Sequence, residues 1–308
     1  LFYVGHPAHW HNINNLANRL KQDGHKILIV IRKKDVLHNL TQSSNLDIIY
    51  LENKKKRSLI SLICSILIRH LEMVKIIYYY KPAIMAGTDI VISQLGKLFN
   101  IQTIILNEDD KDAIPLFALF SYPFATTILT PKVCDVGRWS QKQVTYDGYH
   151  ELAYLNPDIF KPDYKIKQYY FPCNKKYFIL RFSSLEAHHD YGKKGISNNF
   201  AIEIIQLLEK YGDIYITSER ELPDSLEKFK IRIKPDDIHH VLYFAEMFIG
   251  DSQTMAAEAA VLGTPSLRFS DFTGKLNYLN ELEIKYGLTI GIPTSQPVKL
   301  LKIIKRLL

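Results

Sequence analysis

The sequence is poor in cysteine, and its cysteines are not arranged for structural chemistry. Cys64, Cys134 and Cys173 are the only three in 308 residues, and they lie far apart. An odd number at such spacing makes neither a disulfide framework nor a zinc site, because both need paired or clustered cysteines. This usage is typical of a reducing compartment, so we expect a cytoplasmic protein.

Several common site motifs are also missing. The chain contains no Walker A sequence, no G-x-G-x-x-G fingerprint, no H-E-x-x-H and no G-x-S-x-G. His188, His189 and Asp190 follow one another, but adjacent side chains rarely point at one ion, and a third ligand at helical spacing is absent. We therefore expect no metal and no bound cofactor.

Long apolar runs are scarce, and the longest one leaves two interpretations open. A basic run, Lys54–Arg57, precedes a helix predicted over Leu59–Tyr80, whose apolar start is too short to span a bilayer. One interpretation is a helix that covers a core and has a solvated basic start. The other is a peripheral contact with the inner face of a membrane, because basic residues beside apolar surface attract anionic lipid.

The length, apolar content and positive charge of the chain indicate its domain number and the kind of partner it binds. Its 308 residues suffice for two domains, and 47% hydrophobic residues support large cores. A net charge of +7 suits an anionic partner, such as a nucleotide sugar or an acidic membrane surface. Nucleic acid is not expected as a partner, because the Lys and Arg residues are scattered and no nucleic-acid-binding signature is present.

The first half of the chain alternates predicted strands with helices. Runs that are apolar on both faces, such as Leu1–Val4 and Ile27–Ile31, are typical of a parallel sheet covered by helices on both sides. Open parallel sheets bind their ligands at the carboxyl ends of their strands. We therefore expect His9, Asp89 and Glu108, which follow three predicted strands, to line one cleft.

A linker separates this half from the next. Pro157, Pro162 and Pro172 occur in a stretch with weak periodicity, which is typical of a connection between domains. We place the boundary near residue 165, with an N-terminal Rossmann-like domain over 1–165 and a C-terminal one over 166–308. The last helix, predicted over residues 297–308, could cross back to the first domain.

The most informative stretch is a strand, turn and helix within Phe248–Pro265. Asp251 and Ser252 in its turn are good N-cap residues, and a helix N-terminus presents free N–H groups and partial positive charge to a phosphate. Glu258, about one turn beyond Thr254, could receive ribose hydroxyls. A capped helix without a ligand is the alternative interpretation.

These motifs resemble known ones. Gly250–Thr254, with Glu258 and a following Leu262–Pro265, resembles the D-S-G-G-x-x-E-E…G-x-P stretch of non-hydrolysing UDP-GlcNAc 2-epimerases. Gly87–Asp89 lies where those enzymes carry G-D-T, and Glu108 lies at the acid of their H-x-E-A-G. The pair His188 and His189 resembles their T-H-R-x-E-N loop.

Over nearly its whole length the chain is similar to the domain-of-unknown-function 354 family. Both carry stretches of the types G-H-P-x-H, G-Y-x-E-L-A-Y-L, A-H-H-D and T-M-x-x-E-A-A-x-L-G-T-P. The resemblance implies a GT-B-like α/β fold, with two Rossmann-like parallel-sheet domains facing a central cleft. The acceptor side would be the first domain and the nucleotide-sugar side the second.

The function implied is that of a GT-B-type glycosyltransferase in cell-surface polysaccharide or glycolipid synthesis. Its donor would be a nucleotide-diphosphate sugar and its acceptor a sugar or a lipid-linked sugar. His9 is the predicted general base. The other predicted catalytic residues are Asp89 and Glu108, and the predicted nucleotide-binding residues are Arg181, Ser183, His188, His189, Ser252, Gln253, Thr254, Met255 and Glu258.

Two other functions stay open. The first is a sugar-nucleotide 2-epimerase with Asp89 and Glu108 as an acid/base pair. Against it, Gln253 and Thr254 replace the epimerase Gly-Gly pair, and the Asp and Thr near residue 88 are exchanged in order. The second is a non-catalytic binding protein of a polysaccharide assembly complex.

Overall fold

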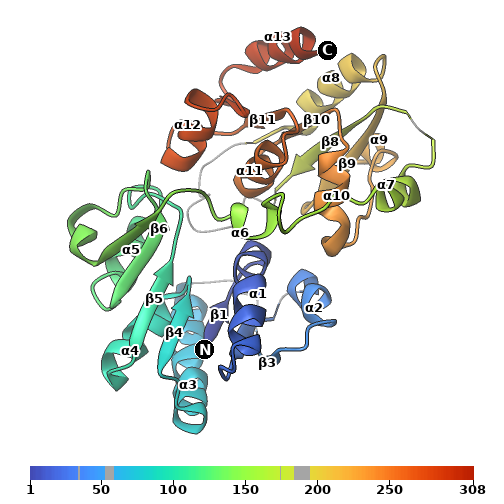
Figure 1. Ribbon diagram of the computed structural model, residues 1–308. Helices are drawn as coiled ribbons and strands as arrows, with labels where there is room; N and C mark the ends of the chain where they lie inside the picture. Colours follow the sequence, from blue (N-terminus) through green and yellow to red (C-terminus); the bar gives the residue numbers. More distant parts are fainter. Residues whose placement is uncertain (34, 53–58, 174, 184–194) are drawn as a thin grey trace. The chain divides into compact units, whose positions relative to one another are not determined.

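The computed structural model describes the chain except residues 34, 53–58, 174 and 184–194 (Figure 1). The chain divides into two compact units, Leu1–Tyr154 and Leu155–Leu308. Each unit is built around its own parallel sheet, one of seven strands and one of five. The α/β class predicted from the apolar strand runs is therefore confirmed. The division precedes the three prolines that the sequence suggested as a linker.

The sheet of the first unit has the order β3-β2-β1-β4-β5-β6-β7, and its neighbouring strands pair in parallel. The chain reverses its direction of travel across the sheet between β1 and β4. In open parallel sheets such a switch point is where ligands bind, beyond the carboxyl ends of the strands. The strands are β1 (Phe2–Val4), β2 (Leu28–Arg32), β3 (Asp47–Leu51), β4 (Ile84–Gly87), β5 (Gln102–Leu106), β6 (Thr127–Pro131) and β7 (Gln143–Tyr146).

Helices cover both faces of this sheet because its strands are apolar on both sides. Phe2 and Val4 pack in a core with α1 and α2, whereas Tyr3 packs in a second core with α3, α4 and α5. This split follows the period of two in a strand, which sends alternate side chains to opposite faces. The helices are α1 (Pro7–Gln22), α2 (Asp35–Thr41), α3 (Leu59–Tyr80), α4 (Ile90–Phe99), α5 (Pro115–Ser121) and α6 (Leu152–Leu155), with a 3₁₀ turn η1 (Gly137–Lys142).

The sheet of the second unit has the order β12-β11-β10-β8-β9, also with parallel pairing throughout. Its switch point lies between β8 and β10. The strand β10 runs straight into the turn at Gly250, so this turn stands at the switch point. The strands are β8 (Tyr177–Phe182), β9 (Asp213–Ser218), β10 (Met247–Gly250), β11 (Ser266–Phe269) and β12 (Thr289–Ile292).

Two helices of the second unit show how capping and packing fix its elements. Ser197 caps α8, since its hydroxyl accepts a hydrogen bond from the N–H of Phe200. The final helix, α13, packs on α8 through Leu300 and Ile304. No helix in the described part of the chain is long and apolar enough to cross a membrane. The helices are α7 (Tyr164–Tyr170), α8 (Asn198–Leu208), α9 (Asp224–Glu227), α10 (Ile238–Tyr243), α11 (Gln253–Val261), α12 (Asn277–Ile284) and α13 (Pro297–Leu307), with a 3₁₀ turn η3 (Pro235–Asp237).

Candidate functional site

The three predicted catalytic residues follow three neighbouring strands of the first sheet. His9 comes after β1, Asp89 after β4 and Glu108 after β5, and these strands are adjacent in the order β1-β4-β5. Because the strands are parallel, their carboxyl ends meet at one edge of the sheet. Sheet topology therefore brings the three loops to the same edge, with His9 and Asp89 on the two sides of the switch point.

The loop after β1 is a short turn rich in histidine. His6 caps α1, since its Nδ1 accepts a hydrogen bond from the N–H of Ala8 at 3.2 Å. Pro7 begins the helix, where its missing N–H costs nothing. His9 lies in the first helical turn, half-buried, with its ring centroid 5.8 Å from that of His6. Two imidazoles thus gather beyond the end of β1.

Asp89 is already committed to two structural partners. Its Oδ1 accepts a hydrogen bond from the N–H of Val91 at 2.8 Å and so caps α4. Its Oδ2 forms an ion pair with Nη1 of Arg69 from α3 at 2.9 Å. Burial and the Asp89 carboxylate together raise the pKa of Tyr3, which lies in the same buried group. An aspartate held this way is a structural carboxylate, with one oxygen on the helix cap and the other on the ion pair.

Glu108 has a histidine partner that the sequence did not predict. The Nδ1 of His150 lies 3.3 Å from Oε2 of Glu108, and the two side chains are 13% and 15% exposed. The ring of Tyr146, at the end of β7, stacks on that of His150 with a centroid distance of 6.3 Å. Burial lowers the pKa of His150 to about 4 despite the nearby carboxylate. The imidazole is therefore neutral at neutral pH and can exchange a proton with an adjacent group.

A second carboxylate lies next to this pair in the chain. Glu151 is buried, and its charge and that of Glu108 both act on Tyr146, whose pKa is raised first by burial. The thiol of Cys134, from the segment after β6, donates to the backbone carbonyl of Glu108 at 2.9 Å. The only signal in the sequence was the polar pair His150 and Glu151 inside an aromatic run.

Asp251 ties together the switch point of the second sheet. Its Oδ1 accepts a hydrogen bond from the N–H of Ser183 at 2.6 Å, just beyond β8. Its Oδ2 accepts one from the N–H of Ile196 at 3.2 Å. A Cβ atom on Gly195 would lie 2.2 Å from Oδ2, so glycine leaves room for the carboxylate. One buried side chain thus holds the chain at both ends of residues 184–194, which contain the predicted His188 and His189 and lie outside the described residues.

Ser252, and not Asp251, caps α11. Its hydroxyl accepts a hydrogen bond from the N–H of Met255 at 3.4 Å. Gln253, Thr254 and Met255 form the half-buried first turn, and the alanines that follow are buried. This turn stands at the carboxyl edge of the second sheet, where a helix N-terminus can present N–H groups to an anion. Phosphate binding by this turn stays a prediction.

Two other predicted nucleotide-binding residues have partners within the second unit. Glu258 is buried in α11, and its Oε1 lies 3.1 Å from Nε2 of His239 in α10. Arg181, near the end of β8, pairs through its guanidinium with Glu219, which follows β9. Arg181 and Glu219 therefore both lie on the β8 side of the switch point. The ribose-binding role of Glu258 stays a prediction, and it requires a carboxylate that also serves His239.

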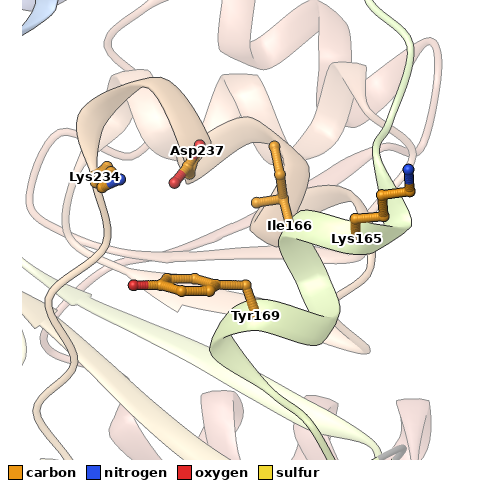
Figure 2. Close-up of a pocket in the computed structure, with 5 residues that line it drawn as sticks. All are labelled: Lys165, Ile166, Tyr169, Lys234 and Asp237. Atoms are coloured by element: carbon orange, nitrogen blue, oxygen red, sulfur yellow. The ribbon is translucent and has the colours of Figure 1, made fainter.

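A pocket of about 220 Å³ lies elsewhere in the second unit and contains none of the predicted residues. Figure 2 shows Ile166 and Tyr169 on α7 beside Lys234 and Asp237 on the segment before α10, and Lys165 of α7 also lines the pocket. The hydroxyl of Tyr170 donates to Asp237 at 2.8 Å and fastens the two segments together. Sites for drug-sized ligands usually enclose about 300–1,000 Å³, so this pocket is small for a nucleotide sugar.

Solved structures with the same fold belong to two classes of nucleotide-sugar enzyme. UDP-GlcNAc 2-epimerase from Methanocaldococcus jannaschii, in complex with UDP-GlcNAc and UDP, is 13% identical, with a TM-score of 0.70 over 99% of this chain and 91% of that one. S. aureus MnaA with UDP is 14% identical, with a TM-score of 0.69 over 99% and 88%. Spinosyn rhamnosyltransferase SpnG with thymidine diphosphate is 13% identical, with a TM-score of 0.62 over 99% and 90%.

At this identity the structures establish the fold, which is the GT-B-like α/β fold shared by epimerases and glycosyltransferases. No curated protein matches the sequence. One family model matches residues 3–291, which is nearly the whole chain, and it is described as a protein of unknown function. The chain therefore belongs to the DUF354 family.

Proposed function

We propose that this protein is a glycosyltransferase that takes its sugar from a nucleoside diphosphate. The observation that carries the proposal is the arrangement at the switch point of the second sheet. There the first turn of α11 stands beside Ser183, which the buried Asp251 holds in place. A rigid turn of free N–H groups at that edge is suited to a diphosphate.

In this function the second unit stabilises the departing diphosphate. The N–H groups of the turn Ser252–Thr254 and the guanidinium of Arg181 supply fixed dipoles and positive charge. Such groups stabilise developing negative charge without reorganisation at the moment of reaction. The loss of the sugar–phosphate bond is therefore assisted by the protein's own donors.

In the first unit His9 is the proposed general base for the acceptor hydroxyl. Imidazole accepts protons near neutral pH, and His9 lies in a half-buried turn at the sheet's carboxyl edge. Asp89 does not serve as an acid or base in this proposal, because both of its oxygens accept hydrogen bonds from Arg69 and Val91. That feature favours a transferase over the epimerase, in which Asp89 would have to take up or give a proton.

Epimerisation remains the second candidate because of Glu108. The Glu108 and His150 pair supplies a half-buried carboxylate beside an imidazole whose pKa burial lowers to about 4. A carboxylate and an imidazole side by side can act as general base or general acid on a neighbouring group. The two candidates differ in what they need, since an epimerase converts a nucleotide sugar without any acceptor.

The test begins with the thermal stability of the full chain in the presence of UDP, GDP, CMP, dTDP and their sugars. A ligand at one hundred times its Kd stabilises the folded state by about 2.7 kcal/mol, so one nucleotide should raise the Tm clearly above the others. A flat panel at millimolar ligand would overturn both candidates. Incubation of the selected sugar without acceptor then separates them: a transferase leaves it unchanged, and an epimerase gives a mixture of two sugars.

A further inference from the structure

The side of α3 that faces solvent is apolar, contrary to the usual pattern of a surface helix. Its exposed positions recur every three or four residues, from Cys64 through Leu71 to Tyr79. The large apolar side chains in this stripe are between 44% and 83% exposed, and Lys75 is the one charged residue among them. The opposite stripe of the helix, with Met73 and Ile77, already packs in the core.

The neighbouring helices continue this surface. In α5 the exposed positions Leu116, Leu119 and Phe120 form a second apolar stripe, and α5 contains no charged residue. At the end of α4, Leu98 is 73% exposed beside Phe99. Scattered exposed apolar residues are normal, but contiguous apolar surface on adjacent helices marks an interaction site.

The three helices form one layer on the same face of the sheet. The Nε2 of His70 in α3 lies 2.9 Å from Oε1 of Gln94 in α4. The Nε2 of Gln94 donates to the carbonyl of Phe120 in α5 at 3.0 Å. The buried hydroxyls of Ser93 and Ser121 also meet, at 3.2 Å. These bonds place α4 between its neighbours, so the stripes of α3 and α5 flank a common surface.

The charges around this surface are mostly positive. The sequences of the three helices contain one acidic residue, Glu72. Lys75 and Lys97 are exposed on α3 and α4, and Lys81 is exposed just after α3. Near the end of α5, Lys142 donates to three backbone carbonyls, and the charge of Lys97 reaches it. This surface therefore exposes apolar side chains with lysines beside them.

We propose that the outer face of α3, α4 and α5 docks on the surface of an anionic lipid bilayer. The apolar side chains would enter the boundary between head groups and acyl chains, and the lysines would reach the phosphates. A second copy of the chain fits less well, because it would bring the lysines of both copies into one interface, and protein interfaces are depleted in lysine. This inference does not rest on the proposed function, although it would bring a transferase to lipid-linked acceptors.

The test is flotation of the full chain with lipid vesicles. The protein should float with phosphatidylcholine vesicles enriched in phosphatidylglycerol and remain unbound with phosphatidylcholine alone. The double variant Leu71→Glu/Phe120→Glu should lower the vesicle partition coefficient at least about tenfold, because it places charge in the apolar stripes. The matched control is Ile284→Glu, since Ile284 is an apolar residue 84% exposed in the second unit. This control should float like the wild type.

A second variant separates charge from apolar contact. Lys75→Glu/Lys97→Glu should weaken flotation several-fold at low salt and by less at high salt, because screening removes the attraction. Thermal melts should show that all variants remain folded, since the changed positions are exposed. Equal flotation of wild type and L71E/F120E would overturn the proposal. So would a dimer, measured by light scattering, that L71E/F120E dissociates.

Discussion

At the scale of single residues, the side chain of Asp251 holds two separate backbone segments in place. Each of its oxygens accepts one backbone hydrogen bond, from Ser183 and from Ile196. Burial raises the pKa of Asp251, and these two hydrogen bonds and Arg220 oppose that rise. Burial of this carboxylate is therefore costly, and both of its oxygens accept hydrogen bonds, as buried polar atoms usually do.

We expect Asp251→Asn to destabilise the second unit by about 1–3 kcal/mol, because the amide –NH₂ replaces one acceptor and leaves a buried N–H without a partner. The same change should abolish stabilisation by a nucleoside diphosphate. Urea unfolding with and without the nucleotide measures both effects. Asp158→Asn, the same substitution at an exposed position, is the control and should leave both unchanged.

His150 should make stability depend on pH. Its folded pKa of about 4 is below the ordinary 6.5, so between these values the unfolded chain binds a proton that the folded chain does not. Stability should therefore fall as pH falls from 6.5 to 4, by up to about 3 kcal/mol, and the contribution is fully present above 6.5.

Urea unfolding across this pH range checks the sign for the wild type and for His150→Gln. The variant has no imidazole to protonate, so its stability should fall less on acidification. The exposed His25→Gln serves as the control and should keep the wild-type slope. An unchanged slope in His150→Gln would mean that other groups carry the pH dependence.

At the scale of elements, local sequence patterns predicted helix bounds and caps, whereas an edge strand depended on contacts distant in sequence. The bounds Leu59–Tyr80 of α3 and the Ser252 cap of α11 could be predicted from the apolar run and from capping chemistry alone. The strand β7 was not predicted, because Gln143–Tyr146 is a short edge strand of mostly polar residues that forms only against β6. Its loop carries His150, so that part of the candidate site was missed with it.

The N-terminus of α11 permits a comparison of two helix caps. Ser252→Ala and Ser197→Ala each remove a cap hydroxyl, and each should cost about 0.5–2 kcal/mol. Only Ser252→Ala should also reduce the rise in Tm caused by a nucleoside diphosphate, because only α11 is proposed to hold it. Equal nucleotide effects in the two variants would show that α11 is not the phosphate site.

At the scale of the whole molecule, each unit has its own sheet, cores and switch point. The parallel sheets could be predicted from the alternation of strands and helices, and the ends of several strands could be located from the polar loops that follow them. The partners Arg69–Asp89, Glu108–His150 and Ser183–Asp251 could not, since each joins residues brought together only by the folded sheet. The sequence was therefore sufficient to locate the loops of the candidate site. The pairs of side chains within it could be identified only from the folded structure.

Two units with separate cores should unfold as two transitions in calorimetry of the full chain, because contacts cluster within each unit. A nucleoside diphosphate should raise the Tm of one transition only. Ile205→Ala, in the core of the second unit, should lower that same transition, whereas Ile92→Ala should lower the other; each substitution costs about 2–5 kcal/mol. A nucleotide that raised the transition lowered by Ile92→Ala would assign diphosphate binding to the first unit and overturn the division of roles proposed above.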